Sequence, residues 1–161
     1  MSTIREAATD EEWNRGCAML QKVYVGDGFT TAERAADFMR RERLESEGAF
    51  LLAVSNSGEV IGAVLFLNEG SLLHQVALPG EREFRLLAVL PDARGEGVGH
   101  ALVSECVKRA NADDAIGLVL WTQPTMHAAH RLYAHMGFVH DPARDELDPR
   151  GFTRLVFVKV V

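Results

Sequence analysis

The sequence predicts a mixed α/β fold, and two patterns in the order of its elements support that prediction. Two apolar runs, 50–54 and 60–67, flank a short turn of sequence NSG, which is typical of an antiparallel β-hairpin. Residues 83–122 then read as a strand, a helix and a second strand. Such a βαβ unit places its two strands parallel to each other. The sheet that contains both units is therefore expected to be mixed and mostly antiparallel.

The remaining elements follow from capping residues and apolar periodicity. Thr9 with Glu12, and Thr30 with Glu33, form capping boxes that each open a helix. Over residues 124–137, apolar side chains recur every three or four positions, which predicts a further helix. In chain order we expect a strand over 3–7, helices over 9–23 and 30–45, strands over 50–54, 60–67 and 83–90, a helix over 100–111, a strand over 117–122, a helix over 124–137 and a strand over 152–161.

Length and composition predict one domain over residues 1–161. The chain is 47% apolar and 25% charged, which is ordinary for a soluble globular protein of this size. Its apolar runs are far shorter than the roughly 20 residues of a membrane span, so we expect a cytoplasmic protein with no membrane partner. The excess of arginine over lysine, together with many alanines, indicates a GC-rich bacterial genome.

Charge and ligand-type residues exclude several classes of function. A net charge of −6 provides no basic surface for nucleic acid and favours a small cationic partner. Cys17 and Cys106 lie in helical segments without C-x-x-C spacing, so buried reduced thiols are expected. His127 and His130 could share a helix face, but spacing places no carboxylate or cysteine beside them, and no metal is expected.

The segment ARGEGVGHAL, residues 93–102, places glycines at every second position between a strand and a helix. Small residues let the backbone approach an anion closely, and the N–H groups that open a helix carry partial positive charge. The segment does not match a dinucleotide-binding motif, because His100 occupies the position of the third glycine and the next strand does not end in an acidic residue. It does not match a P-loop either, because the sequence contains no Gly-Lys-Ser/Thr triplet. A pyrophosphate site remains, beside the alternative of a tight turn with a solvated Arg94.

Two motifs resemble a known family. LAVLPDARGEGVGHAL resembles the central motif of the GNAT superfamily of acetyl-CoA-dependent N-acetyltransferases, whose pattern Gln/Arg-x-x-Gly-x-Gly/Ala is met by Arg94, Gly97 and Gly99. AAHRLYAHMGF, which contains Tyr133, resembles the helix that follows in that family. The order of elements agrees over nearly the whole chain.

The resemblance implies a twisted sheet of about six or seven strands with about four helices, in which a parallel strand pair splays apart to form a cofactor cleft. It implies that backbone groups of Leu87, Ala88 and Val89 bind the pantetheine of acetyl-CoA, with a bulge near Leu87 as the device that parts the strands. Met126 occupies the position at which many members of the family carry an Asn that contacts the cofactor, so we do not expect that contact in this protein. The pyrophosphate is assigned by the same resemblance to Arg94, Gly95, Gly97, Val98, Gly99 and His100.

Acetyl transfer to an amine needs a base for the ammonium proton and an acid for the departing thiolate. By resemblance Glu83, five residues before Ala88, is the candidate base; the alternatives are water as the base and a surface carboxylate paired with Arg85. Tyr133 is the candidate acid, and its alternative is a core tyrosine. A backbone N–H of Val89 or Ala88 is expected to meet the developing oxyanion. Since no nucleophilic serine motif occurs, we expect direct transfer in a ternary complex.

Two loops are expected to bound the acceptor site by the same resemblance. Tyr24, Asp27 and Phe29 lie in the first, and residues 144–146 lie in the second. Asp27 or Glu146 could meet a cationic amine, with ordinary solvated loop charge as the alternative.

The predicted function is transfer of acetyl from acetyl-CoA to a primary amine of a small molecule. The alternatives are a protein N-terminal or lysine acetyltransferase and a non-catalytic acyl-CoA-binding module. The terminal strand, which ends at Val160 and Val161, would suit pairing across a homodimer.

Overall fold

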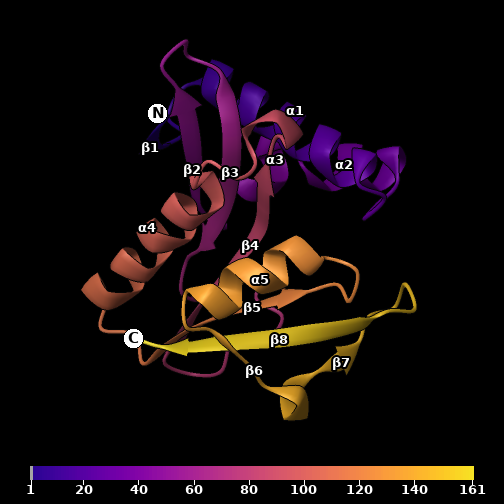
Figure 1. Ribbon diagram of the computed structural model, residues 1–161, viewed down its shortest axis with the longest axis vertical. Coiled ribbons are helices and arrows are strands. Elements are labelled where there is room, and N and C mark those ends of the chain that lie inside the picture. Colours follow the sequence, from indigo (N-terminus) through magenta and orange to yellow (C-terminus); the bar gives the residue numbers. More distant parts are fainter. Residues whose placement is uncertain (1) are drawn as a thin grey trace.

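One mixed sheet runs through residues 2–161, the part of the chain that the computed structural model describes (Figure 1). Its helices are α1 (Asp10–Gly26), α2 (Ala32–Phe38), α3 (Arg41–Leu44), α4 (Val98–Ala112) and α5 (His127–His135). Its strands are β1 (Ser2–Glu6), β2 (Gly48–Ser55), β3 (Val60–Leu67), β4 (Glu81–Val89), β5 (Gly117–Thr122), β6 (Val139–His140), β7 (Glu146–Leu147) and β8 (Thr153–Val160). Among these described helices, none is long and apolar enough to cross a membrane.

The strand order confirms the predicted mixed, mostly antiparallel sheet. The strands lie in the order β1-β2-β3-β4-β5-β8-β6, and β7 pairs with β8. β4 and β5 are parallel, whereas the other described neighbours are antiparallel. The short strands β6 and β7 lie in a polar loop for which the sequence predicted no strand. They pair with the outer side of β8 at residues 157–158 and 153–154, so the terminal strand is not an open edge over its whole length.

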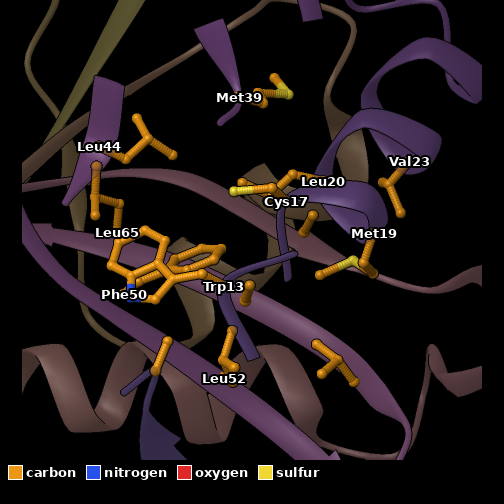
Figure 2. Close-up of a cluster of buried hydrophobic side chains, with 14 of the residues drawn as sticks. Trp13, Cys17, Met19, Leu20, Val23, Met39, Leu44, Phe50, Leu52 and Leu65 are labelled. Atoms are coloured by element: carbon orange, nitrogen blue, oxygen red, sulfur yellow. The ribbon is translucent and has the colours of Figure 1, made fainter. Parts of the chain in front are cut away.

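The sheet buries apolar side chains on both faces because neighbouring residues of a strand point in opposite directions. In β2, Phe50 and Leu52 belong to the core that α1 covers, whereas Leu51 and Ala53 belong to the core that α4 and α5 cover. Figure 2 shows the first core, where the rings of Trp13 and Phe50 stack with centroids 4.9 Å apart. The continuous apolar runs of the hairpin therefore reflect burial on two sides.

The second predicted helix is two helices in the structure. Its cap is Thr31 rather than Thr30, so Glu33 does not complete a capping box. α2 ends before Met39, and the side-chain amide of Gln21 donates a hydrogen bond of 2.9 Å to the Met39 carbonyl. This contact from α1 satisfies a carbonyl that the interrupted helix leaves free, which a local sequence pattern does not reveal.

β4 carries a β-bulge at the position that the resemblance implied. Arg85 pairs with Leu65 and Ala88 pairs with Ala63, so β4 has one residue more than β3 between these pairs. Leu86, inside the bulge, adopts a φ of 61°. This left-handed conformation costs a leucine about 1–2 kcal/mol.

β4 and β5 part just before the bulge. Their parallel pairing covers only residues 81–83 and 117–119. β5 continues to pair with β8 through Thr122, while the second half of β4 stays with β3. The parallel strands therefore splay apart, as the resemblance implied, and leave one side of β4 unpaired within the sheet (Figure 1).

Both cysteines are free and buried, in agreement with the prediction. Burial raises the pKa of the Cys17 thiol to about 11. The pKa of the Cys106 thiol is also raised by burial. A thiol in this state is a poor nucleophile near neutral pH.

Gly16→Ala is expected to destabilise the fold, because α1 lies directly on β2 at this glycine. An added Cβ would lie 2.5 Å from Cε2 of Phe50 and 2.9 Å from Cδ2 of Leu52. Such overpacking typically costs about 1–3 kcal/mol of unfolding free energy, which urea denaturation followed by circular dichroism measures. Gly26→Ala, in the same helix, meets no atom within 4 Å and is the control. Equal unfolding midpoints for the two variants would contradict the packing argument.

Candidate active site

Two neighbouring cavities lie where β4 and β5 part. The cofactor cavity, as we call the larger, has a volume of about 880 Å³ and lies among the glycine loop, the start of α5 and the end of α1. The acceptor cavity, about 500 Å³, lies among α2, β5 and the segments around residues 72–75 and 148–154. The two cavities share wall residues, namely Tyr24, Phe29, Leu87, Met126 and Ala129.

The glycine loop forms one wall of the cofactor cavity. Gly95 and Gly97 adopt φ values of 83° and 82°, which glycine tolerates without strain. α4 begins at Val98 directly after Gly97, and no side chain caps its first turn. The N–H groups of that turn have no partner within the helix and are available to an anion. All six residues predicted for the pyrophosphate line this cavity: Arg94, Gly95, Gly97, Val98, Gly99 and His100.

Arg94 is held in place by two hydrogen bonds. Its Nε donates to the Val89 carbonyl at 3.1 Å, and its Nη2 forms an ion pair of 2.7 Å with Asp27. Asp27 was predicted to bind the acceptor, but it lines the cofactor cavity and not the acceptor cavity. Its carboxylate orients Arg94 beside the glycine loop, a pairing between distant segments that the loop sequences do not indicate.

The free side of β4 presents the backbones of Leu87 and Val89. The N–H of Leu90 donates to Ile61 of β3 at 2.9 Å, so by strand alternation the backbone of Ala88 also faces β3. The carbonyls of Leu87 and Val89 face the opening, where they accept hydrogen bonds from Tyr24 and Arg94. The N–H groups of the same two residues point to this side, whereas the predicted contribution of the Ala88 backbone conflicts with its pairing to β3.

Tyr24 and Phe29, both predicted to bind the acceptor, lie where the two cavities meet. The Tyr24 hydroxyl donates to the Leu87 carbonyl at 3.1 Å, and the Phe29 carbonyl accepts a hydrogen bond from Gln123. Burial raises the pKa of the Tyr24 hydroxyl. These residues therefore form the wall at the junction and contact the acceptor cavity from one end.

Tyr133 reaches the acceptor cavity from α5 and is 4% exposed. Its ring packs among Phe84, Phe138 and Phe157, with ring centroids 5.8 to 6.1 Å away. Burial raises the pKa of its hydroxyl, which therefore stays protonated near neutral pH. Tyr133 is thus both a core residue and a wall of the cavity that meets the free edge of β4.

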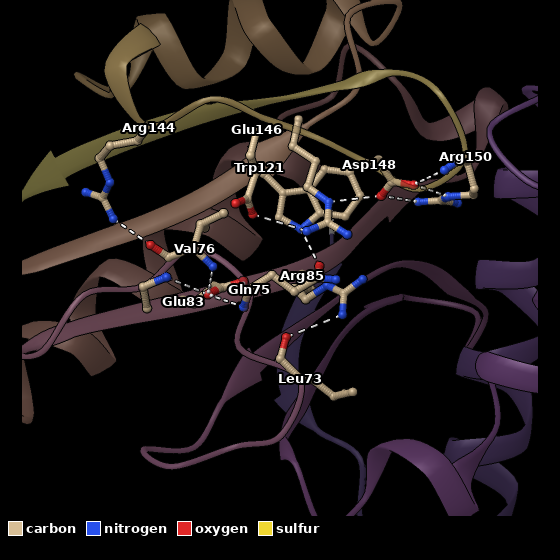
Figure 3. A network of polar contacts seen from close by, with 12 residues as sticks. Leu73, Gln75, Val76, Glu83, Arg85, Trp121, Arg144, Glu146, Asp148 and Arg150 are labelled. Atoms are coloured by element: carbon tan, nitrogen blue, oxygen red, sulfur yellow. Dashed lines mark hydrogen bonds and ion pairs between the residues drawn. The ribbon is translucent and has the colours of Figure 1, made fainter.

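Glu83 does not line either cavity, which conflicts with its predicted role as the base. Its side chain is fully buried, and its carboxylate accepts hydrogen bonds of 3.0 to 3.3 Å from the backbone N–H groups of Gln75, Val76 and Ala77 (Figure 3). The alternative of an ion pair with Arg85 is not present either among the described residues. The geometry favours a structural role, in which Glu83 fixes the loop that leads into β4.

That loop has two further anchors. The Trp121 indole N–H donates to the Gln75 side chain at 2.6 Å, and Arg144 donates to the Val76 carbonyl at 2.6 Å. Arg144 also pairs with Glu81 at 2.8 Å. Since Leu72, Leu73 and Gln75 line the acceptor cavity, these contacts hold one of its walls in place.

The second loop predicted to bound the acceptor site does contribute to the acceptor cavity, but with residues further along the chain than predicted. Residues 144–146 do not line the acceptor cavity; Asp145 binds His140, and Glu146 binds Arg154. The cavity is lined instead by Asp148, Arg150 and Arg154 of the same loop, and by residues for which the sequence predicted no role at the acceptor, among them Phe38, Arg85 and Trp121. Arg85 did carry a signal, because it is a charged residue within the apolar run EFRLLAVL.

The helix histidines have protein partners. The rings of His127 and His130 lie 5.9 Å apart, and Nε2 of His130 lies 3.0 Å from the Gln123 carbonyl. Within residues 2–161 no group of three or more histidine, cysteine, aspartate or glutamate side chains could hold a metal ion.

A glycine loop beside a parted parallel strand pair is the arrangement that the sequence resemblance implied for an acetyl-CoA-dependent transferase. The family model described as the acetyltransferase (GNAT) family matches residues 11–138. The chain therefore belongs to the GNAT family of acetyltransferases, as the sequence motifs indicated. A comparison with curated protein sequences gave no match.

Solved structures of the same fold share little sequence with this chain. A GNAT-family acetyltransferase of Staphylococcus aureus Mu50 is 15% identical, with a TM-score of 0.75 and 99% of each chain covered. The PaiA N-acetyltransferase of Thermoplasma acidophilum, in complex with coenzyme A, is 16% identical, with a TM-score of 0.73 over 100% of this chain and 99% of that one. The ribosomal-protein-S18-alanine N-acetyltransferase of Escherichia coli is 16% identical, with a TM-score of 0.71 over 100% and 94%. At sequence identities this low, the structural similarity shows that these proteins share a fold with this chain and does not assign a substrate to it.

Gly97→Ala is expected to weaken coenzyme A binding. Alanine at a φ of 82° is strained by about 1–2 kcal/mol, which shifts the loop even though the added Cβ meets no atom within 4 Å. We expect a dissociation constant raised about tenfold, measured by isothermal titration calorimetry. Gly58→Ala is a matched control, because its φ is 88°, its Cβ also meets nothing, and it lies in the β2–β3 turn. Equal affinity of both variants for coenzyme A would count against the loop as the phosphate site.

Proposed function

We propose that the protein transfers acetyl from acetyl-CoA to a primary amine of a small molecule, by direct attack in a ternary complex. The observation that carries this proposal is the meeting of the two cavities at the free edge of β4, with Tyr133 in the wall beside it. An acetyl donor in one cavity and an amine in the other would meet at that edge. Such proximity supplies a large part of the rate of a two-substrate reaction.

The described residues fit coenzyme A on three counts. The left-handed glycines leave open space beside the first turn of α4. Arg94 places a guanidinium, oriented by Asp27, beside the loop, and Leu87 and Val89 present backbone groups that β5 does not pair. When bound, acetyl-CoA supplies an acetyl group activated as a thioester. We assign the pyrophosphate to the glycine loop and the pantetheine amides to the free edge of β4. The N–H of Val89 is the candidate donor to developing negative charge.

Tyr133 is the proposed proton donor to the departing sulfur. Its hydroxyl is neutral near pH 7, because burial raises its pKa, and a neutral hydroxyl is a hydrogen-bond donor. The aromatic cage of Phe84, Phe138 and Phe157 fixes the ring. The packing that made Tyr133 look like an ordinary core residue is therefore what positions it.

Water in the acceptor cavity is the proposed base. Glu83 is engaged by three backbone N–H groups and faces away from the cavity. Hydrogen bonds from Arg150 hold the pKa of Asp148 well below its usual range, so this carboxylate is a weak base. Asp37, at the cavity rim, pairs with Arg43 at 3.7 Å.

A small acceptor suits the dimensions of the acceptor cavity. Its volume is about 500 Å³, within the range usual for sites of small organic ligands. A protein N-terminus or a lysine side chain is the alternative acceptor, and an assay panel that includes peptides beside amines and amino acids separates the two. The other alternative, a non-catalytic acyl-CoA-binding module, predicts cofactor binding without amine-dependent thiol release.

Tyr133→Phe is expected to lower kcat about 10²-fold, the lower end of the usual contribution of general acid catalysis. Phenylalanine keeps the packing with Phe84 and Phe138, so the affinity for coenzyme A should not change. Thiol release measures the rate, and calorimetry measures the affinity. Tyr24→Phe, which removes the hydrogen bond to Leu87, is the comparison and should affect KM more than kcat. A normal kcat for the Tyr133→Phe enzyme would show that the Tyr133 hydroxyl does not act as the proton donor.

Glu83→Gln is expected to lower stability and leave the pH profile of kcat unchanged. A glutamine can keep its oxygen on the N–H groups of residues 75–77, but its N–H₂ then replaces the second oxygen, which lies 3.3 Å from the N–H of Gln75. One mismatched buried group costs about 1–3 kcal/mol. For a chain of this size that lowers Tm by about 2–4 °C per kcal/mol. Differential scanning calorimetry and thiol release at several pH values test both parts. If kcat instead falls 10²-fold or more, with the acidic limb of its pH profile lost and Tm unchanged, Glu83 is the base after all.

A further inference from the structure

The acceptor cavity contains an arginine with no carboxylate partner within residues 2–161. Arg85 lines this cavity, and its one hydrogen bond to protein is long, 3.4 Å from Nη1 to the Leu73 carbonyl (Figure 3). No ion pair of Arg85 occurs among the described residues, although most other arginines of the chain have one. A guanidinium has five N–H donors, so most of its donors are free to bind a ligand.

Aromatic rings hold the Arg85 side chain in place. Its guanidinium carbon lies 5.3 Å from the ring centroid of Phe38 and 5.6 Å from that of Trp121. Such cation-π contacts orient the side chain while leaving its N–H groups available at the edge of the guanidinium. Arg85 is therefore a fixed cation in a partly apolar cavity, where a charge interaction is stronger than in water.

Other charges around the acceptor cavity do not neutralise Arg85. Asp148 is occupied by Arg150 and Arg154, each at 2.9 Å, and Glu83 turns toward the loop at residues 75–77. Burial lowers the pKa of Arg85, the negative charge of Glu83 opposes that shift in part, and the positive charges of Arg154 and Arg150 add to it. The charged side chains that line the cavity are Arg34, Arg85, Arg150 and Arg154 against Asp37 and Asp148. The lining side chains therefore carry two more positive than negative charges; Glu146, outside the cavity, offsets one of them by pairing with Arg154. An anion beside Arg85 would balance the remainder.

We propose that the acceptor carries a carboxylate that binds Arg85, so that the substrate class is an amino acid or a similar amino carboxylic acid. This inference rests on the proposed acetyl transfer and names its substrate class. A carboxylate matches the planar fork of a guanidinium through two parallel hydrogen bonds. Arg85 binds and orients the acceptor, and takes no part in making or breaking bonds.

The apolar walls of the acceptor cavity indicate the rest of the substrate. Phe29, Phe38 and Trp121 line it together with aliphatic side chains, including Leu72 and Leu73. Such walls favour an apolar side chain on the amino acid, because burial of apolar area stabilises the complex by roughly 25 cal/mol per Å². Phenylalanine, leucine and methionine are therefore better candidates than lysine or a polyamine.

A binding experiment tests the carboxylate site apart from catalysis. The full-length protein, saturated with coenzyme A, is titrated with L-phenylalanine, L-leucine or L-methionine and with the amide of each. Tryptophan fluorescence is the readout, since Trp121 adjoins Arg85 and the other tryptophan, Trp13, lies in the core under α1. We expect each acid to bind at least tenfold more tightly than its amide, and Arg85→Gln to abolish that preference.

Two further variants make this result specific. Arg131→Gln, an exposed arginine of α5 outside both cavities, removes the same charge and should keep the preference. Arg85→Lys keeps the charge without the planar fork and should give an intermediate preference; it also carries the test if Arg85→Gln does not fold. Equal binding of acids and amides by the parent protein, a preference that survives Arg85→Gln, or no binding of any acid would overturn the proposal.

Thiol release from acetyl-CoA then separates this inference from the proposed function. Faster release with the acids than with the amides, lost in Arg85→Gln through a raised KM, supports both. Release that is equal with acids and amides keeps acetyl transfer and overturns the carboxylate site. Acid-selective binding without release by any amine in the panel supports the carboxylate site and overturns acetyl transfer.

Discussion

The end of the pairing between β4 and β5 is the constraint on which the rest of the site depends. Fully paired parallel strands would satisfy each other's backbone groups and leave no opening within the sheet. Because the pairing stops after three residue pairs, β4 keeps a free side at Leu87 and Val89. Unpaired backbone groups inside a protein are costly, and part of this cost is offset where Tyr24 and Arg94 donate to the two carbonyls. The same two side chains thereby connect α1 and the glycine loop to the opening.

The bulge in β4 explains why Leu87 does not share a face with Glu83, although the two lie on one strand. Glu83 precedes the bulge, and its own surroundings are set by the N–H groups of residues 75–77. Plain alternation puts Glu83, Arg85 and Leu87 on one face. The extra residue in the bulge instead places Leu86 in the core under α1 and Leu87 in the core under α4. A shift of one residue reverses the facing of every later residue. A leucine at a φ of 61° gives no local signal of this, since such positions usually carry glycine.

The parts of the site that could be predicted are those formed by one short segment. The glycine loop combines its turn, its helix start and Arg94 within a few residues, so its spacing indicates an anion site, and the family resemblance specifies a pyrophosphate. Tyr133 belongs to a comparably compact motif. The acceptor cavity is different, because Phe38, Gln75 and Trp121 come from separate segments that meet only after folding. Nothing in the local sequence around any of them indicates that contact. The break between α2 and α3 could not be predicted either, because it too depends on a contact with a distant segment, α1.

The charge of the acceptor site is likewise a local property that the whole-chain charge does not predict. A net charge of −6 suggested a cationic partner, but exposed charges are largely screened beyond about 8 Å at physiological ionic strength. Inside the cavity the electrostatic potential is set by the nearest charged groups. There Asp148 is neutralised by two arginines, while Arg85 has no ion-pair partner among the described residues. The surface acids that set the net charge can help to keep the protein soluble. They have little influence on a ligand that lies between Arg85 and the free edge of β4, so the proposal of a carboxylate on the acceptor rests on the cavity and not on the composition.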